Sequence, residues 1–200
     1  MTDARKKERA AAPAMNAGLV ETAIRRHVDH RANLLIPEAA VRYRSGTHVD
    51  WKGAAHPQFS DYRADFMLVT KAGYGTELEV KVSRGDWKAD LAKPKWAAMP
   101  EWITRFIYVV PADLDIPEFV PPSAGVWHVL PDRMRRQYPT PHEVVDGLCI
   151  QVVRAPHVLG REKVPQPVID RWMQSFYYRY WDQRTHVFAR VPQAIREGVV

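Results

Sequence analysis

Two carboxylates and a lysine lie in one stretch of this chain, at a spacing that suits phosphodiester chemistry. Asp65 stands at the start of an apolar, β-branched segment, 66–70, while Glu79 and Lys81 fall within a second one, 78–82. The glycine-containing segment between them predicts a reversal of the chain. In such a hairpin Asp65 lies near Glu79 and Lys81, and we predict that this patch is the active site.

Side chains alternate between the two faces of a strand. Leu78, Val80 and Val82 therefore point into a core. Glu77, Glu79 and Lys81 point the other way. Carboxylates and an ammonium gathered on one patch are poorly suited to packing in an apolar core, but they are suitable for binding a metal ion.

The residue types fit hydrolysis of a phosphodiester bond by a bound Mg²⁺ (or Mn²⁺). A divalent ion makes a water nucleophilic near neutral pH and neutralises charge on the phosphate. Mg²⁺ prefers oxygen ligands, of which proteins usually supply one or two carboxylates. Asp65, Glu79 and the Val80 carbonyl are the predicted ligands, and Lys81 is placed to hold the attacking water or to stabilise developing charge.

A basic helix is expected directly after this hairpin. Ser83 matches the first position of a capping box, with Asp86 in the answering position, and Pro94 ends the helix after about Lys93. The neighbourhood carries the cations predicted to contact nucleic-acid phosphates, Arg84, Lys88, Lys93 and Lys95. The alternative for each of them is a charge on a solvated helix face.

The remaining periodicity predicts an α/β domain with a central mixed sheet flanked by helices. The expected elements are a helix over 17–30, strands over 34–43, 105–111, 126–130 and 148–154, and an amphipathic helix after Val164. We divide the chain into a flexible basic arm (1–15), a main domain (16–158) and a C-terminal helical extension (159–200).

Residues 44–63 contain three turn signals and are expected to form a long irregular loop beside the substrate groove. His48 and His56 in this segment are further metal-ligand candidates, against the alternative that both are simply exposed. Glu21 lies at the edge of the apolar face of the first helix, where it either reaches the site as an extra ligand or is solvated.

Composition narrows the classes of function. The net charge of +6 and pI near 9.5 favour anionic partners, nucleic acid first. Cys149 is the only cysteine, which excludes a disulfide framework and a cysteine-based zinc site. No stretch approaches the roughly 18 apolar residues of a membrane span, and the charged N-terminus has no signal-peptide core, so we expect no membrane partner and a cytoplasmic location.

Asp65 followed by Glu79-Val80-Lys81 on the adjacent strand resembles the signature of the PD-(D/E)XK nuclease superfamily. The run EVKVSRGDWKADLAKPKW, followed by RFIYVVP and PPSAGVWHVL, looks most like the MmcB-like putative DNA-repair endonucleases and their phage relatives. The resemblance covers roughly residues 17–156. Ala64 stands where the proline that names the superfamily would be.

The resemblance implies a restriction-endonuclease-like core (α-β-β-β-α-β) with an extra C-terminal helix. It implies a metal-dependent endonuclease (a hydrolase) acting on DNA in repair or phage DNA processing, in a bacterial or phage-infected cell. Asp65 and Glu79 would be metal ligands, Lys81 the catalytic lysine and Glu21 the first-helix ligand of some branches. Ser83, Asp86, Asp90 and Lys93 match the polar pattern that follows E-x-K in this branch. Alanine at Asp65, Glu79 or Lys81 is expected to abolish cleavage and leave the fold intact.

Two alternatives remain open from the sequence. One is a nuclease-like module that binds nucleic acid without cutting it. The other is an interaction protein that docks through the aromatic helix 169–181, a segment that also suggests a homodimer.

Overall fold

The computed structural model describes residues 15–29, 32–91, 99–131 and 147–188. Along the chain the elements are α1 (Ala17–His27), β1 (Asn33–Val49), β2 (Ala55–Thr70), β3 (Gly75–Val80), α2 (Arg84–Leu91), β4 (Ile103–Pro111), β5 (Gly125–Pro131), β6 (Leu148–Arg154) and α3 (Gln166–Phe188). Each predicted helix and strand is present, with ends that differ by a few residues except in β1 and β2.

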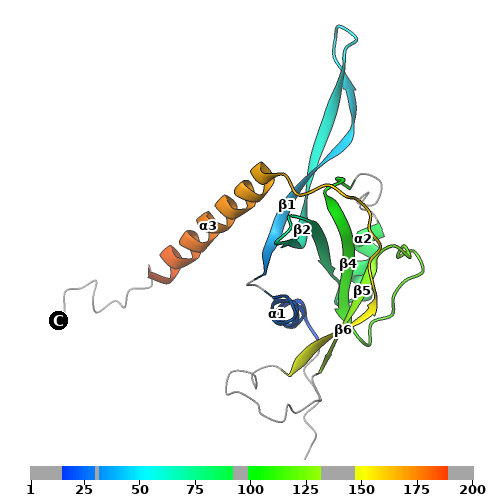
Figure 1. Ribbon diagram of the computed structural model, residues 1–200, viewed down its shortest axis with the longest axis vertical. Helices are drawn as coiled ribbons and strands as arrows, with labels where there is room; N and C mark the ends of the chain where they lie inside the picture. The colour runs from blue at the N-terminus through cyan, green and yellow to red at the C-terminus, as the bar shows by residue number, and fades with distance from the viewer. Residues whose placement is uncertain (1–14, 30–31, 92–98, 132–146, 189–200) are drawn as a thin grey trace, which may run out of the picture.

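The strands form one mixed sheet in the order β1-β2-β3-β4-β5-β6 (Figure 1). β3, β4 and β5 run parallel to their neighbours within this group, and the other neighbouring pairs are antiparallel. The connection from β3 to β4 contains α2, and a helix is the usual way to make the long crossover that parallel strands need. The predicted α/β class with a central mixed sheet is therefore confirmed.

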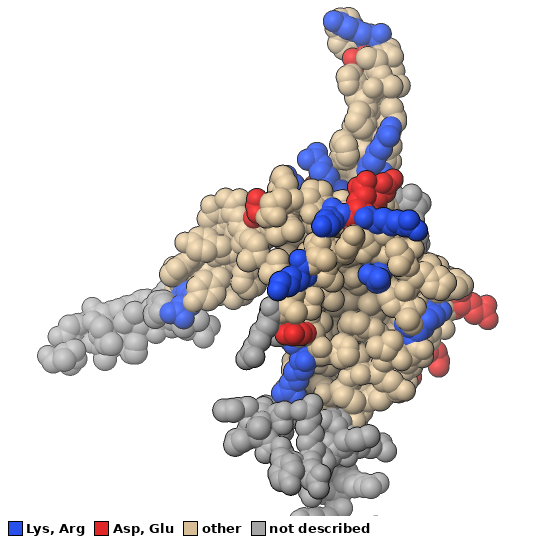
Figure 2. Space-filling model, viewed as in Figure 1, with Lys and Arg blue, Asp and Glu red and all other residues tan. Residues whose placement is uncertain are grey.

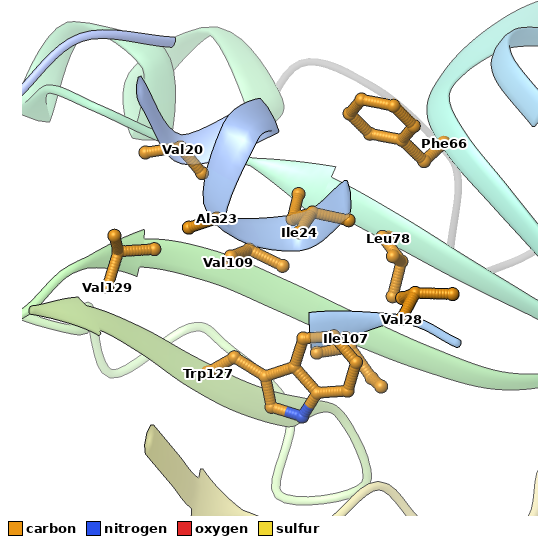
Figure 3. Packing of buried hydrophobic residues seen from close by; sticks show 10 residues of the cluster. All are labelled: Val20, Ala23, Ile24, Val28, Phe66, Leu78, Ile107, Val109, Trp127 and Val129. Carbon is orange, nitrogen blue, oxygen red and sulfur yellow. The ribbon is translucent and has the colours of Figure 1, made fainter. Parts of the chain in front are cut away.

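Helix α1 covers one face of the sheet. It begins at Asn16, whose Oδ1 accepts a hydrogen bond from the Leu19 N–H at 3.0 Å. Its buried residues Val20, Ala23 and Ile24 point onto the central strands (Figure 3). There they pack in one cluster with side chains from β2 to β5: Phe66, Leu78, Ile107, Val109, Trp127 and Val129.

The other face carries two separate apolar clusters. One, near β1 and β2, includes Met67 and Trp172. The second, over β4 and β5, includes Phe106 and Tyr108, and Trp87 of α2 packs on it with a ring-centroid distance of 4.6 Å to Tyr108. The space between these two clusters is where β3 presents its polar side chains.

The prediction of an irregular loop at 44–63 is wrong. β1 continues to Val49 and β2 begins at Ala55, so this segment forms a long antiparallel hairpin that projects from the sheet (Figure 1). Two of the turn signals sit inside strands for physical reasons. Gly46 borders a register shift in the pairing, and Pro57 lies in a part of β2 that pairs with β1 alone, where a missing N–H is tolerated.

The C-terminal segment returns across the sheet before α3 begins. The Val164 N–H donates to the Gly73 carbonyl at 2.9 Å, and Val164 is buried in the cluster near β1 and β2. Gly75 permits this approach, since a Cβ there would lie 2.9 Å from Val164 Cγ2. The start of α3 then packs on β1, and farther along the helix Arg179 donates to the Pro37 carbonyl at 3.0 Å and to the Glu38 carboxylate. The end of the helix extends away from the sheet (Figure 1).

In the described part of the chain, no helix has the length and apolar character needed to cross a membrane.

We predict that Trp172 anchors α3. Its side chain is 2% exposed, its Nε1 donates to the Ala40 carbonyl at 2.7 Å, and its ring contacts Trp102 edge-on. Trp172→Ala should lower the free energy of unfolding by about 3–5 kcal/mol in urea denaturation, because it removes a buried ring and leaves a cavity. Arg171→Ala, at the neighbouring position but exposed, should change it by no more than about 0.5 kcal/mol. Equal effects of the two substitutions would contradict this role.

Candidate active site

Both faces of β3 are buried. Leu78 packs under α1, as expected, but Glu77 and Glu79 on the opposite face are 0% and 2% exposed, and Lys81 just beyond the strand is 4% exposed. The predicted polar face is therefore not a solvent-facing surface. The expectation that alanine substitutions there leave the fold intact is accordingly revised: these side chains are part of the interior.

Lys81 lies between two carboxylates. Its Nζ donates to Glu79 Oε1 at 2.7 Å and to Asp90 Oδ1 at 3.1 Å. The Tyr108 hydroxyl donates to Asp90 Oδ2 at 2.7 Å. These bonds connect the end of β3 to α2 and β4, and we call Glu79, Lys81, Asp90 and Tyr108 the lysine network.

The lysine network determines the charge state of its cation. Burial by itself lowers the pKa of Lys81, but the Glu79 and Asp90 carboxylates beside it reverse the shift, and the pKa is raised above its ordinary value. Lys81 is therefore an ammonium at neutral pH. It can donate hydrogen bonds and stabilise negative charge, but it is not a general base there.

A second tyrosine–carboxylate pair lies beside the network. The Tyr62 hydroxyl of β2 donates to Glu77 Oε2 at 2.5 Å. Burial and the adjacent carboxylates raise the pKa of both Tyr62 and Tyr108. Each phenol consequently stays protonated and remains a hydrogen-bond donor to its carboxylate partner.

Asp65 approaches the same strand from β2. Its Oδ2 accepts a hydrogen bond from the Val80 N–H at 2.7 Å. The alternation of side chains between the two faces of the sheet is interrupted at Asp65. Ala64 and Met67 are three residues apart, yet both pack in the same cluster. Opposite Asp65 on β1, Glu38 has a positive φ of 51°. This local change of phase is what lets the Asp65 side chain bond to β3.

The predicted catalytic residues are thus brought together in space. Asp65 bonds to the backbone of Val80, and Lys81 bonds to Glu79. Asp65 is half-buried whereas Glu77, Glu79 and Asp90 are buried, so Asp65 marks the side on which the network meets the surface.

The residues present fit a divalent cation in donor type and charge. Glu77, Glu79 and Asp90 are buried carboxylates, and Asp65 is adjacent, whereas Lys81 is the only buried ammonium described among them. An excess of buried negative charge favours a cation. Asp65, Glu79 and the Val80 carbonyl would hold it. Among the described residues no three acidic, histidine or cysteine side chains form a ready-made metal-binding group, so waters or phosphate oxygens would complete its coordination.

Other predicted site residues lie farther out. Glu21 is half-buried on α1, the helix that packs on the opposite face from Glu79. Arg84 is exposed and forms an ion pair with Asp115 at 3.1 Å, and Lys88 is exposed on α2. Lys93 and Lys95 lie outside the described residues.

Helix α2 starts as predicted but is capped differently in one detail. The Asp86 N–H donates to Ser83 Oγ at 3.1 Å, which confirms Ser83 as the cap. Asp86 Oδ2 instead accepts from the Val82 N–H at 3.0 Å, one residue before the expected partner. The cap therefore ties the helix start directly to the end of β3, which orients Asp90 towards Lys81.

Sequence reasoning placed Glu77 on the polar face and Asp90 in the polar pattern after E-x-K, but gave neither a role in the site. It missed Tyr62 and Tyr108. The hydroxyl of Tyr108 within a buried strand is a detectable signal, because such a group needs a partner. Asp90 lies about two helical turns after the Ser83 cap, on the same side of the helix as the cap, and this spacing is a second signal. Tyr62 has no signal, since it falls in the segment predicted to be a loop.

His48 and His56 face each other on the long hairpin, far along the strands from Asp65. His56 Nε2 lies 3.1 Å from Asp50 Oδ2. A surface cavity of about 560 Å³ lies elsewhere and contains none of the predicted site residues; its lining is Met99, Pro100, Glu101, Ile103, Phe119, Pro121, Ser123 and Leu159.

Models of known protein families give no match to this chain, and neither do curated proteins. Among solved structures, one similar protein is a protein of unknown function from Silicibacter pomeroyi. It is 18% identical, the alignment covers 94% of this chain and 95% of that chain, and the TM-score is 0.48. A similarity at this level indicates neither the fold nor the function.

We predict that the lysine network balances buried charge. Lys81→Met should lower the free energy of unfolding by about 3–5 kcal/mol, because it leaves Glu79 and Asp90 buried without their ammonium. The triple variant Lys81→Met/Glu79→Gln/Asp90→Asn should recover part of this loss. Lys88→Met, which removes an exposed ammonium nearby, should have an effect within about 0.5 kcal/mol. Denaturation in EDTA measures all three, and a Lys81→Met loss no larger than that of Lys88→Met would contradict the prediction.

Proposed function

We propose that this protein is a metal-dependent endonuclease that hydrolyses phosphodiester bonds in DNA, built on a restriction-endonuclease-like core. The observation that carries the proposal is the convergence of Asp65, Glu79 and Lys81 from β2 and β3 on one polar site in the interior. Burying charge costs free energy that an apolar core would not, so a network of this kind is a candidate for chemistry rather than for stability.

The order of elements supports the same interpretation. α1, β1, β2, β3, α2 and β4 follow one another in the α-β-β-β-α-β order of the superfamily that the sequence resembles. Asp65 is on the second of these strands, and Glu79 is on the third. The capped helix α2 follows immediately and carries exposed cations for phosphate contact.

In this mechanism each residue has a separate task. Asp65, Glu79 and the Val80 carbonyl would hold Mg²⁺ or Mn²⁺, which supplies an activated water and neutralises phosphate charge. Lys81, held as an ammonium by its carboxylate partners, donates hydrogen bonds to the water or to the non-bridging phosphate oxygen. Asp90 positions Lys81 and is itself fixed by the Tyr108 hydroxyl.

One observation favours the alternative, a nuclease-fold module that binds nucleic acid without cutting it. The side chains of Glu79 and Lys81 are only 3% and 5% exposed, so a phosphate must reach them past Asp65. If that approach stays closed, the exposed cations Arg84 and Lys88 would still bind a polyanion.

We predict metal-dependent cleavage. Purified protein should cut one or more of plasmid, linear, single-stranded and branched DNA with Mg²⁺ or Mn²⁺ and not in EDTA. Asp65→Asn, Glu79→Gln and Lys81→Gln should each lower the rate by about a hundredfold or more, because each removes a charge that acts on the phosphate or its metal. Arg161→Gln, an exposed residue outside the site, is the control.

Because the three residues are buried, each variant is compared by circular dichroism and thermal melting before its activity is interpreted. Full activity of a folded variant under saturating metal would remove that residue from the mechanism. Wild type that binds DNA but cuts none of the substrates would favour the binding module.

We also propose that a second copy of this chain covers the exposed side of α3. Its apolar residues there are about half-exposed: Met173, Phe176, Tyr177, Tyr180 and Trp181. If two α3 helices pair antiparallel with their centres near Tyr177, Asp170 of each copy faces Arg184 of the other. The charges on this surface are therefore complementary between two identical copies.

The expected outcome is a dimer in sedimentation velocity that Tyr177→Glu dissociates. Tyr178→Glu is the matched control, because Tyr178 is equally exposed, at 58%, but lies a third of a turn away on the helix. A wild-type monomer at micromolar concentration would overturn the proposal.

A further inference from the structure

The outer part of the β1–β2 hairpin, residues 42–61, stands free of the sheet, and we call it the arm. Nearly all of its residues are exposed or half-exposed, and no third strand pairs with it in the described structure (Figure 1). At about 3.3 Å per residue its strands extend about 25 Å beyond Val41. A two-stranded ribbon of this kind is rarely stable by packing alone, so its length suggests a role in contact with a partner.

The tip of the arm is built to hold a defined shape. Asp50 Oδ1 accepts hydrogen bonds from the Lys52 and Ala54 N–H groups at 2.9 and 2.8 Å, and the Asp50 N–H donates to the Ala54 carbonyl. Gly53 takes the positive φ of 80° that closes the turn. The turn presents Trp51 outwards, and this side chain is 88% exposed.

Cations accompany the exposed rings of the arm. Lys52 Nζ lies 4.8 Å from the centre of the Trp51 ring, and Arg42 Cζ lies 5.1 Å from that of Phe59. Arg44 is directly opposite Phe59 in the pairing. Figure 2 shows Lys and Arg side chains at the tip and along the shaft. Of the two acidic residues in the arm, Asp50 is used in the turn and Asp61 faces Arg42.

We propose that the arm is a nucleic-acid-binding β-ribbon. A two-stranded ribbon fits the major groove of a duplex, Lys and Arg bind phosphates, and an exposed tryptophan stacks on bases. Contact surfaces between proteins are depleted in lysine, whereas the tip of the arm places Lys52 beside Trp51. The inference rests on the proposed function and adds to it the element that holds the substrate.

The position of the arm connects it to the candidate active site. β2 runs without interruption from the tip of the arm to Asp65. Arg63 lies between the two, exposed at the base of the arm, where it is 3.7 Å from Glu38. A duplex held by the arm would therefore be guided towards the side on which the lysine network meets the surface.

The test is binding of the full chain to a fluorescent DNA duplex and to a single strand, followed by anisotropy in EDTA at several salt concentrations. Trp51→Ala/Lys52→Ala should weaken binding about tenfold or more, because it removes a stacking ring and a cation that binds phosphate. Arg42→Ala/Arg44→Ala should lower the slope of log K against log salt by about one for each phosphate that these arginines bind. Tyr178→Ala/Arg161→Ala removes an exposed ring and a cation elsewhere and should bind as the wild type does.

All four substituted residues of the arm are exposed, so both arm variants should melt at the wild-type temperature. Wild-type affinity of both arm variants for both DNA forms would overturn the proposal. So would unchanged DNA binding combined with an altered oligomeric state, which would make the arm a docking site for a second copy. Cleavage is measured in parallel. If the arm variants bind DNA more weakly but the wild type does not cut it with Mg²⁺, only the proposed nuclease activity is refuted. If the wild type cuts DNA and the arm variants bind and cut it equally well, only the proposed role of the arm is refuted.

Discussion

The bonds from Lys81 to Glu79 and Asp90 join the end of β3 to α2 in the interior of the protein. Removing an ammonium and carboxylates from water is costly, and their mutual attraction repays this only with close geometry and further hydrogen bonds. Tyr108 supplies such a bond to Asp90, and the cap of α2 at Ser83 orients the helix that carries it. The position of α2 over the sheet is therefore set by a charge requirement as well as by the packing of Trp87.

Strand β2 links three parts of the molecule that differ in environment. Its outer half belongs to the exposed arm, its middle contributes Asp65 to the polar site, and its last residues pack in the core. The change of phase opposite Glu38 separates these regions, because it turns Asp65 towards β3 while Ala64 and Met67 remain in one apolar cluster. Substrate contact by the arm and chemistry at Asp65 would thus depend on one continuous strand.

Much of the framework could be predicted from local sequence. The apolar period of α1, the short β-branched run of β4 and the Ser83 cap each reflect interactions within a few residues. Asp65, Glu79 and Lys81 could be placed together because the short turn at 71–74 sets the start of one strand beside the end of the next. The arm could not be predicted in the same way: its Gly46 and Pro57 are turn signals unless a facing strand accommodates them, and that strand is known only from the pairing.

By itself, the sequence determined the order and type of the elements and the grouping of Asp65, Glu79 and Lys81, because hairpin pairing and helix caps are local properties. Only the tertiary structure decided that the polar face of β3 is buried, since burial depends on what β2, α2 and β4 place around it. It likewise brought Asp90 and Tyr108 to Lys81 from elements 9 and 27 residues farther along the chain. Such contacts follow from how the sheet and helices pack, and no local pattern encodes them.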